Sequence, residues 1–159
     1  MVHGNFQYRE AKIDDIESMA LIRAEEWETK EYWTGRISGY LNKELHPKDA
    51  LPSRIIYVAT HQDQVIGFVA GHLTLRYGCS GELEWINVAK EYQRKGVASN
   101  LLMLLANWFR EKKALKVCVD VDPANKNARA FYERHGAIPL NPHWLYWKDI
   151  NTVLSFEDK

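Results

Sequence analysis

Apolar residues recur along the chain with two different spacings, and these spacings predict its secondary structure. Continuous or alternating runs rich in β-branched and aromatic residues indicate strands, whereas apolar residues three and four positions apart indicate helices. The predicted strands lie at residues 6–11, 55–60, 65–72, 83–88, 117–121 and 144–150. Predicted helices begin near residue 14, at residue 97 and near residue 125, and a further short helix contains Trp33 and extends to about residue 45.

These elements follow one another in the order β-α-α-β-β-β-α-β-α-β-β. The sequence pattern gives no residue range for the strand before the last one. Residues 46–52 contain two prolines and are predicted to form a loop, and residues 61–64 to form a hairpin turn. No linker, repeat or low-complexity tract interrupts the sequence, so residues 1–159 are interpreted as one domain. The predicted fold class is α/β, with a mixed sheet and a parallel strand–helix–strand crossover in the middle.

The stretch from Leu83 to Trp108 combines a strand, a basic turn that contains glycine, and the start of a helix. Its turn reads Q-x-x-G-x-A, from Gln93 to Ala98. The unpaired N–H groups of a first helical turn converge there, and the helix dipole adds partial positive charge, so the turn is suited to an anion. Gly96 would let the backbone approach a phosphate closely. A glycine that serves only the turn is the alternative.

A second motif follows the short apolar run at residues 117–121. Asn125, Ala128 and Tyr132 are three and four positions apart, so one face of a helix can present all three. Gly136 is suited to end that helix, because the residue after a helix often adopts a left-handed conformation.

Three features lie within residues 82–137: the strand ELEWINV, the Q-x-x-G-x-A turn, and the pattern N-x-x-A-x-x-x-Y with Gly-Ala after it. Together they resemble the GNAT superfamily of acyl-CoA-dependent N-acetyltransferases. The resemblance implies a single GNAT-like α/β (α+β) domain, with a mostly antiparallel sheet, a central parallel crossover and flanking helices. It implies acetyl-CoA as the co-substrate and a primary amine of a small molecule or peptide as the acceptor. A non-catalytic module that binds acyl-CoA or a partner on the same fold is the alternative.

Direct transfer of an acetyl group to an amine needs a base for the ammonium proton and an acid for the leaving thiolate. Glu82 and Glu84 alternate on one strand and should share a face, and each fits a spacing that the resembling family uses for its base. Glu84 is preferred narrowly, and two solvated glutamates are the alternative. The resemblance assigns the acid to Tyr132, which could otherwise be a core tyrosine.

The resemblance also implies a binding site for acetyl-CoA along the strand, the turn and the second motif. The backbone of Ile86 and Val88 would pair with the amides of the pantetheine arm, with the Val88 N–H near the thioester carbonyl. Asn125 would bind the same arm or cap its own helix. The whole expected set is Ile86, Val88, Gln93, Arg94, Lys95, Gly96, Val97, Ala98, Ser99, Asn125, Ala128 and Tyr132.

Composition excludes several other classes of function. Lysine plus arginine and aspartate plus glutamate both total 21, and this zero net charge disfavours nucleic acid as a partner. No apolar run reaches the ~18 residues of a membrane span, and the N-terminal sequence lacks the apolar core of a signal peptide. Cys79 and Cys118 make no disulfide framework, which fits a reducing cytoplasm. The choice between monomer and homodimer stays open.

Two further interpretations concern ligands. The six histidines show no metal-binding spacing along the chain, so no metal site is predicted; they are His3, His46, His61, His72, His135 and His143. In the resembling family the acceptor enters between the first helices and the last strands. Aromatic and acidic residues there would suit a cationic amine, unless they only fill the core; they are Glu25, Glu26, Trp27, Tyr32, Trp33, Tyr40, His143, Trp144, Tyr146 and Trp147.

Overall fold

A computed structural model describes residues 5–155, and its centre is one seven-stranded sheet with the strand order β1-β2-β3-β4-β5-β7-β6. The strands are β1 (Gln7–Glu10), β2 (Ala50–His61), β3 (Gln64–Thr74), β4 (Gly81–Val88), β5 (Val117–Asp120), β6 (Ile138–Asn141) and β7 (Trp144–Trp147). The helices are α1 (Ile16–Ala24), α2 (Lys30–Leu41), α3 (Val97–Glu111), α4 (Lys126–Arg134) and α5 (Asn151–Leu154). The predicted order of elements is confirmed, and the short α5 is added to it.

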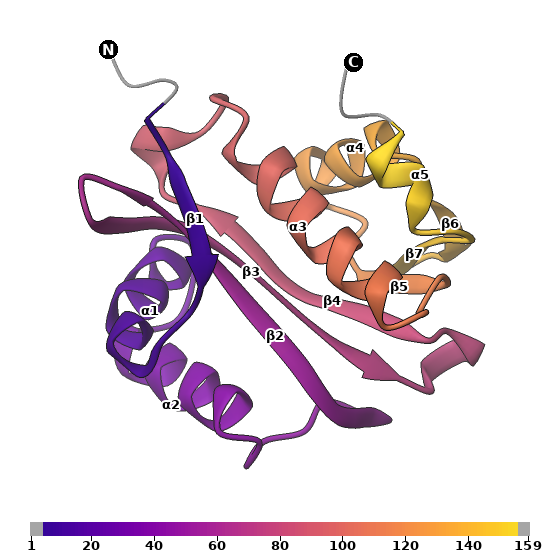
Figure 1. Cartoon of the computed structure of the whole chain (residues 1–159), viewed down its shortest axis with the longest axis horizontal. Helices are drawn as coiled ribbons and strands as arrows, with labels where there is room; N and C mark the ends of the chain where they lie inside the picture. Colours follow the sequence, from indigo (N-terminus) through magenta and orange to yellow (C-terminus); the bar gives the residue numbers. More distant parts are fainter. Residues whose placement is uncertain (1–4, 156–159) are drawn as a thin grey trace.

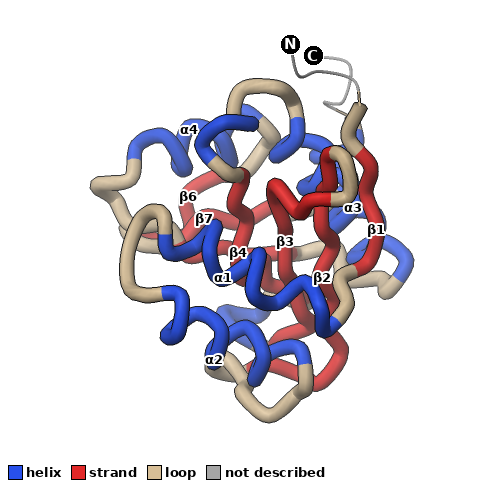
Figure 2. Tube along the Cα trace, turned by 90° about the vertical axis from the view of Figure 1, so that its left-hand side faces the viewer, coloured by secondary structure: helices blue, strands red, loops and turns tan. Residues whose placement is uncertain are grey.

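The helices cover both faces of the sheet. Helices α1 and α2 lie on one side of the strands, and α3, α4 and α5 lie on the other (Figure 1). A view turned by 90° shows α1 and α2 crossing in front of β2 and β3 (Figure 2). Each face has its own apolar core: Met19, Ile37 and Phe68 are fully buried in one, and Leu101 and Phe109 in the other. The predicted α/β class with a mixed, mostly antiparallel sheet is confirmed.

The parallel part of the sheet is short. Strands β4 and β5 pair in parallel only from Gly81 opposite Val117 to Leu83 opposite Val119. Beyond Leu83, β4 continues to Val88 with β3 beside it but without β5. The two strands therefore diverge, and one edge of β4 opens in the middle of the sheet.

Strand β4 contains a β-bulge at Glu84. Leu83 lies opposite Gly71 of β3, and Trp85 lies opposite the adjacent Ala70, so Glu84 is an extra residue on β4. The bulge changes which face the following side chains occupy. Leu83 packs into the core on the α3 side, whereas Trp85 packs into the core below α1 and α2. This irregularity explains why the apolar residues of β4 do not alternate.

Three boundaries differ from the prediction. Strand β2 begins at Ala50 inside the expected loop, because Ala50 pairs with Thr74 of β3. Helix α2 ends at Leu41 and not near residue 45, because the chain turns at Lys43, which has a φ of 62°. The last strand ends at Trp147, since α5 follows directly.

Two expectations about the environment of the chain can be compared with the structure. Cys118 is fully buried, and Cys79 is buried beside it in a small cluster with Trp144; both thiols are free. No helix in residues 5–155 is long and apolar enough to cross a membrane.

Gly81 at the start of β4 provides a test of how tightly the α3 face is packed. A Cβ atom at this position would overlap the ring of Phe109, which is fully buried. We expect Gly81→Ala to lower the free energy of unfolding in urea by about 1–3 kcal/mol. The control is Gly35→Ala in α2, where a Cβ would meet nothing within 4 Å and should stabilise the helix. Equal stabilities of the two variants would contradict this packing.

Candidate functional site

A cleft of about 1020 Å³ lies where β4 and β5 diverge. Of the expected site residues, only Lys95 lies outside its lining. Those that line it are Glu82, Glu84, Ile86, Val88, Gln93, Arg94, Gly96, Val97, Ala98, Ser99, Asn125, Ala128 and Tyr132. The structure therefore brings the two sequence motifs together in one place.

The first wall of the cleft is the free edge of β4. The Ala89 N–H donates to the carbonyl of Ile66 at 2.8 Å, so the main chain of Ala89 faces β3. Because main-chain groups alternate along a strand, those of Ile86 and Val88 face the opposite edge, toward the cleft. The Val88 carbonyl there accepts a hydrogen bond from the Gln93 side chain at 2.9 Å. The edge thus offers strand-like pairing to a molecule in the cleft.

The second wall is the N-terminus of α3. Gly96 is the N-cap residue, with φ of 85°, and no side chain caps this helix end. The first helical hydrogen bond is from the Asn100 N–H to the Gly96 carbonyl at 3.1 Å, so the N–H groups of Val97, Ala98 and Ser99 precede it and have no acceptor within the helix. A Cβ on Gly96 would meet nothing within 4 Å, so the turn is open. These features make the turn suitable for a phosphate.

Two side chains near that turn already have partners. The Nδ1 of His135 lies 2.8 Å from the Phe131 carbonyl and donates to it, because a carbonyl can only accept. The Nε2 atom of the neutral ring therefore accepts from the Ser99 hydroxyl at 3.1 Å. The backbone of Ser99, and not its side chain, is the group left for a ligand.

Helix α4 presents the second motif to the cleft. The Asn125 side chain accepts a hydrogen bond from the Ala128 N–H at 3.1 Å, so its expected role as a helix cap is confirmed. Tyr132 is 6% exposed and packs edge-on against Trp147, with ring centroids 6.0 Å apart. Its hydroxyl makes no hydrogen bond within residues 5–155. Burial raises the pKa of Tyr132, so this hydroxyl keeps its proton at neutral pH.

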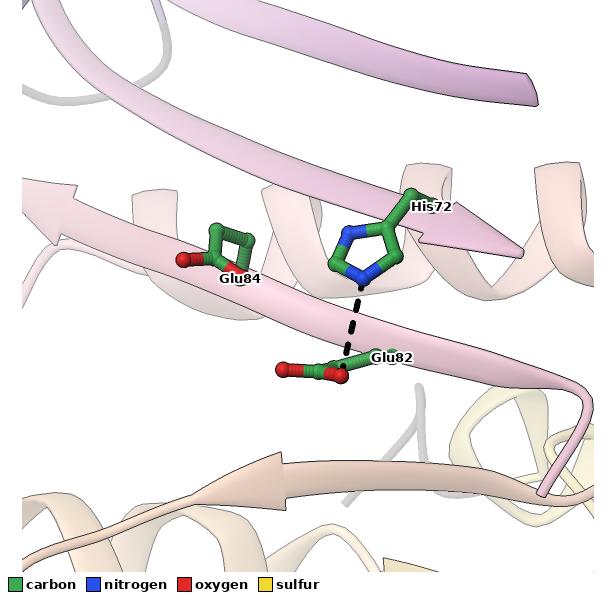
Figure 3. Close-up of side chains that lie close together, drawn as sticks. All are labelled: His72, Glu82 and Glu84. Atoms are coloured by element: carbon green, nitrogen blue, oxygen red, sulfur yellow. Dashed lines mark ion pairs between the residues drawn. The ribbon is translucent and has the colours of Figure 1, made fainter. Parts of the chain in front are cut away.

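The two glutamates of β4 have different surroundings. Glu82 is 4% exposed, and its Oε1 lies 3.5 Å from Nε2 of His72 (Figure 3). The same oxygen lies 3.3 Å from Nε of Arg76. His72 is fully buried, and its Nδ1 lies 2.9 Å from the hydroxyl of Tyr40. Glu82 therefore belongs to a buried polar chain, with two nitrogen atoms at ion-pair distance from its carboxylate.

Glu84 has no such partner among residues 5–155 and is half-buried on the wall of the cleft. Burial raises its pKa, and the negative charge of Glu82 raises it further, while His72, Arg36 and Arg76 act in the opposite direction. A carboxylate with a raised pKa is a better proton acceptor than an ordinary glutamate. The surroundings thus separate two residues that the sequence treated as nearly equivalent.

His72, Glu82 and Glu84 each offer a ligand atom within 4.8 Å of the others. The spacing analysis missed this group because the residues meet across strands: His72 lies opposite Glu82 in the β3–β4 register. The guanidinium of Arg76 beside Glu82 already supplies a positive charge, which favours an internal ion-pair network over a divalent cation. His3, considered for metal binding with the other histidines, lies outside the described residues.

The expected acceptor region is only partly at the cleft. Glu26, Trp27, His143 and Trp144 line it, whereas Trp33, Tyr40 and Trp147 are buried in the cores. The sequence analysis overlooked three arginines on the same wall, which are Arg23 of α1, Arg36 of α2 and Arg76 after β3. The wall is therefore less acidic than expected.

Comparison with known proteins gives consistent results. Residues 13–137 match the family model described as the acetyltransferase (GNAT) family. No curated protein matches the chain. A GNAT-family acetyltransferase structure from Desulfovibrio desulfuricans is 16% identical, with 91% of this chain and 99% of that chain covered and a TM-score of 0.73.

Two archaeal structures show the same fold. Ard1 from Thermoplasma volcanium is 22% identical, with 90% of this chain and 95% of that chain covered and a TM-score of 0.70. The PaiA N-acetyltransferase from Thermoplasma acidophilum, solved in complex with coenzyme A, is 16% identical, with coverages of 92% and 99% and a TM-score of 0.69.

Proposed function

The chain belongs to the GNAT acetyltransferase family, and from this premise we propose that it transfers an acetyl group from acetyl-CoA to a primary amine. One observation carries the proposal: a free strand edge, an uncapped helix N-terminus, Glu84 and Tyr132 all line one cleft. The family assignment indicates the reaction class, and the arrangement of these groups supports a catalytic use of it.

Acetyl-CoA fits the two walls of the cleft. Its pyrophosphate is an anion, which the N–H groups of Val97, Ala98 and Ser99 would bind with the help of the α3 dipole. Its pantetheine amides would pair with the free main-chain groups of Ile86 and Val88. PaiA, a protein with the same fold, binds coenzyme A, which supports this assignment. The exposed side chains of Arg94 and Lys95 are not needed for it.

The chemistry that we propose is direct attack. Glu84 takes a proton from the acceptor ammonium, and the neutral amine then forms a C–N bond to the acetyl carbonyl carbon. The C–S bond breaks, the sulfur takes the proton of the Tyr132 hydroxyl, and the nitrogen releases its second proton to solvent. The products are an acetylated amine and the free thiol of coenzyme A, and solvent returns the proton from Glu84 to Tyr132.

We assign the base to Glu84, and not to Glu82, because of their surroundings. Glu82 is held by His72 and Arg76 and is nearly inaccessible. Burial and the charge of Glu82 both stabilise the protonated form of Glu84, which gives Glu84 a stronger affinity for a proton than an ordinary glutamate has. Glu82 thus acts on the reaction through Glu84.

The first test is binding of acetyl-CoA. At ~100 times its dissociation constant, acetyl-CoA should stabilise the fold by ~2.7 kcal/mol, measured as a rise in the melting temperature. Gly96→Glu would place a carboxylate at the phosphate turn and should abolish the rise. Gly78→Glu is the matched control, because Gly78 also has a positive φ, of 71°, and open space around it but does not line the cleft. A normal shift with Gly96→Glu would move the binding site elsewhere.

The second test separates an enzyme from a non-catalytic module. Release of free thiol from acetyl-CoA is followed with a panel of small amines and peptide N-termini. Turnover with any acceptor supports the enzyme, whereas binding without turnover on the whole panel favours the module.

A further inference from the structure

Three arginines line the acceptor end of the cleft, but they differ in their partners. Arg76 is held by Glu82 at 3.3 Å and stacks on Trp144, with its guanidinium carbon 4.6 Å from the ring centroid. Arg36, on α2, has no carboxylate within 4.0 Å and no hydrogen-bond acceptor anywhere in the part of the chain that the structure describes. Its Nε atom is buried and unpaired.

Arg23, on α1, is similar. One of its terminal nitrogens donates to the Asn87 side chain at 2.7 Å, and its guanidinium lies 4.2 Å from the ring centroid of Trp33. Its Nε is also buried without a partner, and no carboxylate of residues 5–155 lies within ion-pairing distance. A half-buried guanidinium without an acceptor is unfavourable, because it has lost water without gaining hydrogen bonds.

Both guanidinium groups therefore have a buried, unpaired Nε atom and no carboxylate partner within the described residues, and both belong to the wall on which Glu84 lies. We propose that the acceptor carries an anionic group, a carboxylate or a phosphate, which Arg36 and Arg23 bind while the amine of the acceptor reaches Glu84. This inference rests on the function proposed above. Guanidinium groups bind either anion through paired N–H donors. The same positive charges repel a second ammonium, so acceptors with several amines are disfavoured.

The electrostatics around Glu84 agree with this arrangement. Arg36 is close enough to act against the raised pKa of Glu84, and burial lowers the pKa of Arg23 although the charges of Glu26 and Glu84 oppose this shift. The anion-binding groups and the base are thus within electrostatic reach of each other. A small acceptor with its amine a few bonds from its anion can contact both.

The test compares acceptors that differ only in the charged group. Glycine, β-alanine and γ-aminobutyrate are each paired with the corresponding amide, and aminoethyl phosphate is paired with ethanolamine. We expect kcat/KM for the anionic member of the best pair to exceed that of its neutral partner by about 10- to 100-fold. The first three pairs report on a carboxylate, and the fourth reports on a phosphate.

Variants then locate the preference. Arg36→Gln should reduce the ratio of kcat/KM between the two members of a pair to near one, mainly through KM, and Arg36→Lys should restore part of it. Dividing each ratio by the wild-type ratio removes the difference in amine pKa between the members. Arg23→Gln should act in the same direction. The control is Arg110→Gln, since Arg110 is exposed on α3 and does not line the cleft.

The outcomes separate this inference from the proposed function. Two outcomes overturn the inference alone. One is thiol release with neutral, cationic and anionic amines at similar efficiency, and the other is an anion preference that Arg36→Gln and Arg23→Gln leave intact. No thiol release with any acceptor overturns the proposed function, and the inference falls with it.

Discussion

Replacing Glu84 by glutamine should lower kcat/KM at neutral pH by about 10²- to 10⁴-fold, the usual contribution of a positioned base. Glutamine keeps the shape of the side chain but cannot accept the proton of the ammonium. Binding of acetyl-CoA should be unchanged, because Glu84 lies on the acceptor side of the cleft. The measurement is thiol release at several pH values with the best acceptor.

The pH dependence identifies the base. The pKa of Glu84 is raised above that of an ordinary glutamate, and protonated Glu84 cannot act as a base. As the pH is lowered, the wild-type rate should therefore begin to fall at a higher pH than it would with an ordinary glutamate as the base. In Glu84→Gln this fall in rate, the acidic limb of the pH–rate profile, should disappear. The rate should instead rise steadily toward the pKa of the amine, so the defect is deepest at low pH.

Glu82→Gln is the matched variant, because it makes the same chemical change two residues away. It removes the negative charge that raises the pKa of Glu84, so the limb should move to lower pH and the plateau should remain. If instead this variant loses the limb and Glu84→Gln keeps it, Glu82 is the base and the assignment is wrong. If neither variant changes the limb, Glu26 on the cleft wall is the next residue to replace.

Tyr132→Phe should lower turnover by about 10²-fold or more, because the ring and its packing stay while the proton donor is lost. Its raised pKa keeps the hydroxyl protonated over the working range of pH, as an acid requires. The melting temperature and the affinity for acetyl-CoA should change little, because the hydroxyl makes no hydrogen bond within the described residues.

Tyr146→Phe on β7 is the control, since Tyr146 is partly buried but does not line the cleft. Similar turnover of Tyr132→Phe and the wild-type protein would exclude Tyr132 as the acid. A leaving thiolate of pKa ~8.5 could then leave without one.

The sequence predicted the parts of the fold that depend on local patterns. Apolar spacing located six of the seven strands and all four long helices, and the turn from Gln93 to Ala98 appears where its glycine indicated. The boundaries near Ala50 and Leu41 were missed, because strand pairing decides the first and a left-handed turn at Lys43 decides the second. The bulge at Glu84 was also missed, because an extra residue is recognised only when the opposite strand is known.

The residues of the site were likewise predicted only where they belong to local sequence patterns. The motif residues could be found because each motif is local, and all but Lys95 line one cleft. The partners of Glu82 could not, because His72 precedes it by ten residues and meets it only through the β3–β4 register. Arg23 and Arg36 carried no signal at all, since their importance depends on which carboxylates the fold leaves beyond ion-pairing distance.

The short parallel ladder between β4 and β5 has a mechanical consequence. Hydrogen bonds divide the sheet into two blocks, β1 to β4 and β5 with β7 and β6, and only three residue pairs join them. A molecule that paired with the free edge of β4 and also contacted α4 would span this seam. Filling the cleft would then make the two blocks unfold as one cooperative unit, where the empty protein can open locally between them.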